Sequence, residues 1–178
     1  MIYLLEGPDG TGKTTLARLL VNKSIDEKRT CLFFHCTSKS ERKTADEDYT
    51  DFLKNLQEWK KLDYDVVIDR AWISNIVYTK VYEPTKKHIS EKLAEELANV
   101  VDKILVCLPK NKGKYMMHFQ QLAKRREETY LEDMDKVYEL FNEFANKYYR
   151  YDMFEHFTNH PEKLNIGDID DWSYMNYN

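Results

Sequence analysis

Residues 4–20 read LLEGPDGTGKTTLARLL, and this stretch decides the fold that the sequence predicts. It contains three of the chain's five glycines within six positions, directly after a short apolar run and directly before Lys13. Glycine is needed where the backbone must take a positive φ or approach another group closely. The apolar run predicts a buried parallel strand, and the leucines after Lys13 recur at helical spacing. The sequence therefore predicts a strand, a glycine turn and a helix in succession.

The segment from Gly7 to Thr14 satisfies the pattern G-x-x-x-x-G-K-[ST], which defines a phosphate-binding P-loop. Backbone N–H groups of such a loop converge on phosphate oxygens, and the N-terminus of the following helix adds its dipole. We expect Lys13 to reach the β- and γ-phosphates of ATP and the Thr14 hydroxyl to bind Mg²⁺. The alternative is an ordinary glycine turn without a ligand. The residues expected to bind ATP are Gly7, Asp9, Gly10, Thr11, Gly12, Lys13, Thr14 and Thr15.

Strands and helices alternate along the rest of the chain. Apolar runs predict further strands at 30–35, 65–69, 103–108 and 151–157, and periodic patterns predict helices at 13–23, 47–62, 74–82 and 91–101. A long helical pattern follows Gly113 and extends to residue 144, whereas residues 158–178 show only a weak pattern. Strands that alternate with helices predict an α/β fold, in which a parallel sheet is covered on both faces. At 178 residues, we expect a single domain.

Composition excludes several classes of protein. The net charge of −4 argues against a nucleic-acid-binding protein, which is usually basic. No apolar stretch approaches the roughly 18–20 residues of a membrane span, and the N-terminus lacks the features of a signal peptide. Three cysteines without a CxxC pattern argue against disulfides and structural zinc. We therefore expect a cytoplasmic protein whose partners are small molecules, with neither nucleic acid nor membrane among them.

Asp69 and Arg70 come directly after the third predicted strand. Ligands of parallel α/β sheets bind at the carboxyl ends of the strands. A carboxylate there can hold Mg²⁺ through water, and the adjacent guanidinium can grip a phosphate with two hydrogen bonds. The alternative is a surface ion pair at a strand end.

A segment at about 109–128 follows the fourth predicted strand and ends in a basic cluster of Lys124, Arg125 and Arg126. Such a segment can act as a lid that lowers cations onto the phosphoryl group in transit, inside a closed and drier site. We therefore assign catalytic roles to Arg125 and Arg126, beside Lys13 and Arg70. The alternative is a solvated helix face, neutralised by the two glutamates that follow.

Aromatic side chains are candidates for a base-binding slot. Tyr78 is the best of them, because it lies two helical turns beyond Arg70. Aromatic residues at helical spacing belong to the core more often than to a site, and this alternative applies to each one. The other candidates are Trp59, Trp72 and Tyr82.

Two motifs resemble those of thymidylate kinases. Residues 4–15 are similar to the family's P-loop, E-G-x-D-G-x-G-K-[ST]-T, and DRAWISNIVY at 69–78 resembles its D-R-Y-x-x-S-x-x-A-Y. The stretch KRREE is also similar to the lids of thymidylate kinases and of the related deoxynucleoside kinases. The resemblance implies a P-loop NTPase fold with a five-stranded parallel sheet and a lid, ATP and Mg²⁺ as cofactors, and a homodimer. The implied reaction is phosphoryl transfer to a deoxynucleoside monophosphate such as dTMP or dUMP.

The same likeness assigns further roles. It implies that Asp9 contacts the sugar or phosphate region of the acceptor, and Arg70 the acceptor phosphate. Members of the family place an extra catalytic arginine either in the P-loop or in the lid, and this P-loop offers none, so the lid must supply it. The implied metal ligands are Thr14 and Asp69. The full set expected to bind the acceptor is Asp9, Phe52, Arg70, Trp72 and Tyr78.

The class of acceptor remains open between two alternatives. The family's R-E-P-G-G-like loop after the second strand is replaced here by HCTSKSER, and the arginine that meets the thymine base has no clear counterpart near residues 47–52. A nucleoside 5′-hydroxyl needs a carboxylate base, typically in an E-P motif, whereas an ionised monophosphate needs cations. Lys39, Arg42 and Lys43 favour a monophosphate, and Glu41 keeps a nucleoside kinase possible. A regulatory P-loop ATPase is a third alternative, disfavoured because no water-positioning glutamine follows Asp69.

Overall fold

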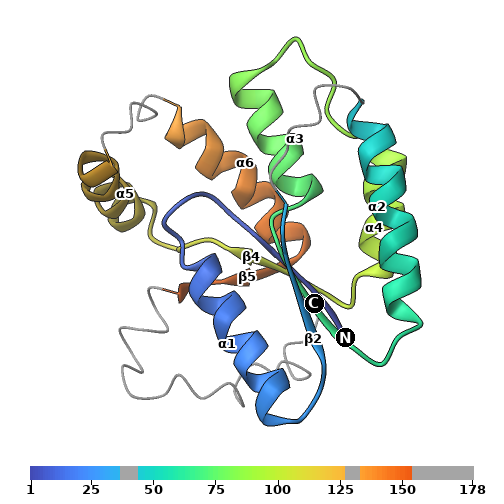
Figure 1. Cartoon of the computed structure of the whole chain (residues 1–178). Coiled ribbons are helices and arrows are strands. Elements are labelled where there is room, and N and C mark those ends of the chain that lie inside the picture. The colour runs from blue at the N-terminus through green and yellow to red at the C-terminus, as the bar shows by residue number, and fades with distance from the viewer. Residues whose placement is uncertain (37–43, 127–132, 154–178) are drawn as a thin grey trace.

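Five parallel strands form one sheet in the order β2-β3-β1-β4-β5, as the computed structural model shows (Figure 1). The structure describes residues 1–36, 44–126 and 133–153, without the side chains of 125 and 126. The predicted α/β fold with a five-stranded parallel sheet is confirmed. The elements are β1 (Ile2–Glu6), α1 (Lys13–Asp26), β2 (Cys31–His35), α2 (Ala45–Lys60), β3 (Asp65–Asp69), α3 (Trp72–Tyr82), α4 (Glu91–Val100), β4 (Lys103–Cys107), α5 (Lys112–Arg126), α6 (Met134–Lys147) and β5 (Tyr149–Tyr151).

Alternate residues of the central strand β1 face opposite sides of the sheet. Ile2 and Leu4 join the core beneath α2, α3, α4 and α6, while Tyr3 and Leu5 join a second core beneath α1. Figure 1 shows α1 on one side of the sheet and these four helices on the other. Because both faces of β1, β3 and β4 are buried, these strands read as nearly continuous apolar runs. The chain leaves β1 for β2 on one side and later passes from β3 across β1 to β4 on the other side, so the carboxyl end of β1 lies at the point where ligands of such sheets bind.

Two predictions about the C-terminal half need correction. The fifth strand is the three-residue β5, which begins two residues before the predicted 151–157; residues 154–157 of that prediction lie outside the described part. Pairing with β4, and not a local pattern, selects this short edge strand. The long helical pattern after Gly113 forms two helices, α5 and α6.

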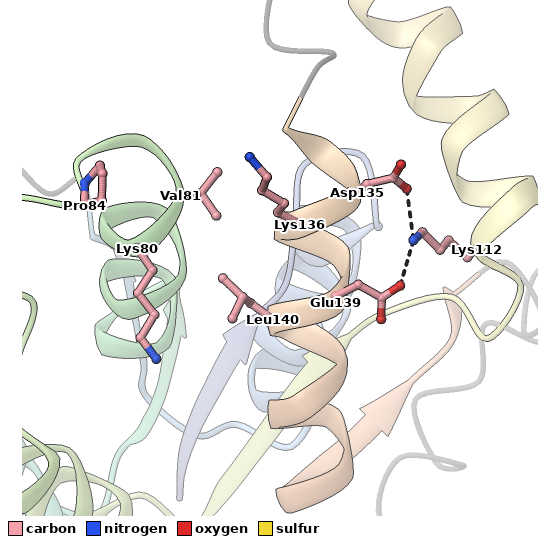
Figure 2. A pocket seen from close by; sticks show the side chains of 8 residues that line it. All are labelled: Lys80, Val81, Pro84, Lys112, Asp135, Lys136, Glu139 and Leu140. Atoms are coloured by element: carbon pink, nitrogen blue, oxygen red, sulfur yellow. Dashed lines mark hydrogen bonds and ion pairs between the residues drawn. The ribbon is translucent and has the colours of Figure 1, made fainter.

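The first residue of α5 joins that helix to α6. Lys112 Nζ lies 3.0 Å from Asp135 Oδ1 and 2.7 Å from Glu139 Oε1 (Figure 2). The same side chains line an open groove of about 700 Å³ between the end of α3 and the start of α6. Of the assigned active-site residues whose side chains the structure describes, none lines this groove. The groove is lined by Lys80, Val81, Pro84, Lys112, Asp135, Lys136, Glu139 and Leu140.

Across residues 1–36, 44–126 and 133–153 we find no helix with the length and apolar character needed to cross a membrane.

Candidate active site

The turn between β1 and α1 has the backbone geometry that its glycines permit. Gly7, Gly10 and Gly12 take φ values of 138°, 75° and 85°. A Cβ on Gly7 would lie 2.3 Å from the carbonyl oxygen of Cys107, so the turn packs directly on the end of β4. Only glycine allows this positive φ and this close approach together.

The N-terminus of α1 is free of side-chain caps. Gly12 at the N-cap offers no side chain, and the first turn of α1 contains no acidic residue. By contrast, Thr44 and Glu47 form a reciprocal capping box on α2. The first N–H groups of α1 therefore remain available to an anion, and the helix dipole favours one there. This arrangement is suited to a nucleotide phosphate.

Lys13 is almost completely buried, with 5% of its surface exposed. Its Nζ donates a 2.6 Å hydrogen bond to the Pro8 carbonyl, to which the Thr11 hydroxyl also donates at 2.8 Å. Burial, and next the charge of Arg70, lower the pKa of Lys13 to about 8. A bound phosphate would favour the charged form again. The Lys13 side chain therefore lies inside the loop, at a position where a bound anion would favour its protonated form.

Asp69, the last residue of β3, lies beside Thr14 at the start of α1. Its Oδ2 is 3.5 Å from the Thr14 hydroxyl and 3.2 Å from Nδ1 of His35. The carboxylate is 2% exposed, and its Oδ1 is buried without a hydrogen-bond partner in the part of the chain that the structure describes. A buried carboxylate oxygen without a partner is costly unless a cation or donor completes it.

This donor set fits Mg²⁺. The ion prefers oxygen ligands and binds through one or two protein groups together with substrate phosphates and water. Within the described residues, no group of three or more His, Cys, Asp or Glu side chains could hold a metal by itself. Thr14 and Asp69 are two neighbouring oxygen donors, a set of the kind that would hold Mg²⁺ together with substrate phosphates.

Arg70 directs its guanidinium back toward the P-loop. It takes a positive φ of 66°, and its backbone N–H donates to the Leu5 carbonyl at 2.9 Å. Its Nη2 forms a very short ion pair with Asp9 Oδ1, and its Cζ lies 5.3 Å from the centre of the Tyr78 ring. Burial by itself would lower the pKa of Arg70, but Tyr78 and Asp9 raise it above its ordinary value. Arg70 thus contacts two other predicted acceptor residues, Asp9 and Tyr78.

Two other predicted acceptor residues are placed differently. Trp72 is 1% exposed and belongs to the core, so it presents no surface to an acceptor, and we correct its assignment. Phe52 is half-buried on α2, where it packs edge-on against Trp59 with ring centres 6.2 Å apart. Trp72 and Phe52 both pack into the core between the helices and the sheet, which is the alternative stated above for aromatic residues at helical spacing.

Helix α5, within the predicted lid, lies over the P-loop. The Tyr115 hydroxyl donates a 3.0 Å hydrogen bond to the Asp9 carbonyl. A Cβ on Gly10 would lie 2.7 Å from Leu122 Cδ1 and 3.8 Å from His118 Nε2. Because Gly10 has no side chain, Leu122 and His118 of α5 can pack directly on the P-loop at this point. Arg125 and Arg126 end α5, and their side chains lie outside the described part of the structure.

No role for Glu6 was predicted from the sequence, whereas the structure buries its side chain between β1 and the turn after β3. Glu6 ends β1 and is 0% exposed, and its carboxylate accepts hydrogen bonds from the backbone at Ala71 and Ile73 and from Ser74. A charged residue at the end of a continuously buried strand was the available signal. His35 and Tyr115 were missed as well, because their partners lie in distant parts of the chain.

Comparisons with known proteins bear on the fold and the family. A protein of Acidianus bottle-shaped virus (isolate Italy/Pozzuoli), named "Putative thymidylate kinase", is 30% identical over 102 residues, which are 57% of this chain and 62% of that protein. The match thus spans less than two thirds of the relative's length. The structure of the YorR protein of Bacillus subtilis, in complex with phosphorylated GDP, superposes with a TM-score of 0.65 and 20% identity, covering 99% of this chain and 100% of YorR.

Thymidylate kinase from Ehrlichia chaffeensis aligns with a TM-score of 0.48 and 17% identity over 90% of this chain and 97% of its own. The sequence model of the family described as "Nephrocystin 3, N-terminal" matches residues 1–103, which are more than half of the chain. That description states no substrate and no reaction, so it does not choose among the functions considered above. The chain therefore belongs to the family described as "Nephrocystin 3, N-terminal", and among P-loop proteins it resembles the thymidylate kinases.

Proposed function

We propose that this protein transfers the γ-phosphoryl group of ATP to the phosphate of a deoxynucleoside monophosphate of the dTMP or dUMP kind. The observation that supports this most strongly is the position of Arg70, whose guanidinium pairs with Asp9 of the P-loop. A cation at this point suits an acceptor that already has a negative charge. The named viral relative adds support for a nucleotide kinase.

The donor side of the reaction depends on α1 and the end of β3. The uncapped N–H groups of α1 bind phosphate oxygens, and Lys13 exchanges its bond to the Pro8 carbonyl for a bond to the β- or γ-phosphate. Thr14 and Asp69 hold Mg²⁺, which when bound neutralises charge on the β- and γ-phosphates. These residues position the donor and stabilise the charge that develops during transfer.

The acceptor side depends on Arg70. In the free protein its guanidinium pairs with Asp9, which is half exposed, and lies beside the Tyr78 ring. An incoming phosphate takes the place of the Asp9 carboxylate beside the guanidinium and accepts two parallel hydrogen bonds from it. Asp9, freed from Arg70, then turns to a hydroxyl of the acceptor sugar. No group on the chain needs to remove a proton, because a monophosphate oxygen is already ionised near neutral pH.

The lid supplies the remaining cations. Leu122 and His118 of α5 lie against Gly10, so closure requires a movement of the end of α5 and not of the whole helix. In the proposed closed form, Arg125 and Arg126 contact the phosphoryl group in transit and exclude water. We infer that residues 1–178 form one catalytic unit, with its lid at about 109–128, and that the resemblance to thymidylate kinases extends to a homodimer.

Measurement of product formation with a panel of acceptors tests the proposal. ADP or GDP release from ATP or GTP is followed with dTMP, dUMP, other monophosphates, thymidine and deoxyuridine. We expect transfer from ATP to at least one deoxynucleoside monophosphate, and loss of transfer in a folded Lys13→Ala variant. A preference for free nucleosides would establish the deoxynucleoside kinase alternative. Nucleotide hydrolysis without any acceptor would establish the regulatory ATPase.

A further inference from the structure

The buried carboxylate of Glu6 is saturated with hydrogen bonds from a single turn. Its Oε1 accepts from the backbone N–H groups of Ala71, at 2.8 Å, and Ile73, at 3.2 Å. Its Oε2 accepts from the N–H of Ser74, at 3.2 Å, and from the Ser74 hydroxyl in a very short bond. Four donors thus fill the acceptor positions of the two oxygens, an arrangement that favours the ionised carboxylate.

This carboxylate caps a helix that has no cap of its own. The N-cap residue of α3 is Ala71, whose side chain accepts no hydrogen bond. Glu6 therefore satisfies the first N–H groups of α3 from 65 residues away, and the helix dipole favours its negative charge. Burial raises the pKa of Glu6, and the hydrogen bonds from Ser74 and Ala71 oppose that rise.

The turn that Glu6 holds also contains Arg70. The positive φ of Arg70 is unfavourable for a residue with a side chain, so the surroundings must impose it. The N–H of Arg70 is fixed by the Leu5 carbonyl, and the next N–H, that of Ala71, by Glu6. Two adjacent residues of β1 thus hold the backbone on which the guanidinium stands.

We propose that Glu6 is a positioning residue, which fixes the turn from Arg70 to Ser74 and thereby aims the Arg70 guanidinium at the P-loop. The inference rests on the proposed function for what Arg70 binds, but the fixing of the turn does not depend on it. Because Glu6 precedes Gly7 directly, the same residue joins the donor loop to the acceptor side. A purely structural cap for α3 would stabilise the fold without affecting acceptor binding specifically.

The test compares Glu6→Gln with the matched control Asp65→Asn. Asp65 is also a buried carboxylate, at the opposite end of β3, where it binds Ser24, Arg29 and the N-terminal amine. Both variants replace a buried carboxylate by an amide. Only in Glu6→Gln does the new NH₂ group face the Ser74 N–H, from which it cannot accept a hydrogen bond. Urea denaturation gives the loss of stability of each variant.

We expect Glu6→Gln to lower kcat/KM for the monophosphate by roughly ten- to hundredfold, as a misplaced binding group does, with the KM for ATP changed less than about twofold. Asp65→Asn should leave both constants within about twofold of wild type. In an Arg70→Ala background, Glu6→Gln should cause almost no further loss, because residues that act through one another are not additive. Equal losses in the two variants, or full additivity with Arg70→Ala, would overturn the proposal.

Hydrogen exchange of the Ser74 amide, which loses its carboxylate acceptor in Glu6→Gln, decides the point without enzyme activity. We expect this amide to exchange at least about tenfold faster in Glu6→Gln than in Asp65→Asn under conditions of equal global stability. Equal exchange would refute the fixing of the turn. If wild-type protein phosphorylates no acceptor, the proposed function fails while the exchange result still stands. If Glu6→Gln does not fold, Ser74→Ala, which removes one hydroxyl donor, replaces it in both measurements, with the same direction expected and a smaller size.

Discussion

Replacement of Arg70 is the most direct test of the acceptor site. A charge-assisted bidentate contact between a guanidinium and a phosphate contributes about 1.5–3 kcal/mol. In the free protein, however, the guanidinium already pairs with the half-exposed carboxylate of Asp9. Loss of that pair on binding offsets up to about 1 kcal/mol, as for other partly exposed ion pairs. The net loss is about 0.5–3 kcal/mol, so Arg70→Ala should raise the acceptor KM roughly two- to 150-fold, at about 1.4 kcal/mol for each factor of ten.

The backbone at this position provides an internal control. Arg70 takes a φ of 66°, which glycine adopts without the steric cost that alanine pays. Arg70→Gly should thus be about 1 kcal/mol more stable toward urea than Arg70→Ala, while the two variants lose the same acceptor affinity. Arg70→Lys should recover only part of that affinity, because an ammonium supplies the charge without the planar fork.

The assay measures ADP formation at saturating ATP while dTMP or dUMP is varied. The KM for ATP should change less than the KM for the acceptor, since Lys13 and α1 remain intact in all three variants. An acceptor KM and a kcat that match wild type in folded Arg70→Ala would refute the assignment of Arg70. Better phosphorylation of thymidine than of dTMP by wild-type protein would refute the monophosphate acceptor itself.

Three further predictions concern the P-loop and the lid. A bound phosphate should raise the pKa of Lys13 from its lowered value of about 8, so nucleotide binding at pH 8 should take up a fraction of a proton and nucleotide affinity should fall above that pH. Calorimetry in two buffers of different ionisation enthalpy measures the proton uptake, which Lys13→Ala should abolish. Gly10→Ala should lower the free energy of unfolding by about 1–2 kcal/mol, because its φ of 75° is strained for alanine. Combining it with Leu122→Ala should remove only the clash between the new Cβ and the Leu122 side chain, so part of the loss should remain. Urea denaturation measures the single and double variants, and full recovery of stability in the double variant would contradict this. Arg125→Ala combined with Arg126→Ala should lower kcat more than ATP affinity, and full kcat in that variant would show that the basic cluster is a solvated face.

Local pattern was sufficient for most of the fold. β2, β3 and β4 begin and end within one residue of their predicted bounds, and β3 and β4 read as apolar runs because both of their faces are covered. The P-loop could also be predicted, since positive φ angles at Gly7, Gly10 and Gly12 are a requirement that single residues satisfy. β5 could not be located, because three residues contain no period and only their pairing with β4 defines them.

The sequence by itself determined which groups lie at the carboxyl edge of the sheet: Lys13, Thr14, Asp69 and Arg70 each directly adjoin a strand or helix end. Only the tertiary structure decided how these groups are held. Glu6 meets the turn after β3 across 65 positions, and Trp72 belongs to the core although it stands beside Arg70 in sequence. The physical reason is that period and turn chemistry are properties of neighbouring residues, whereas a saturated buried carboxylate or a filled core position depends on partners that folding brings together from distant segments.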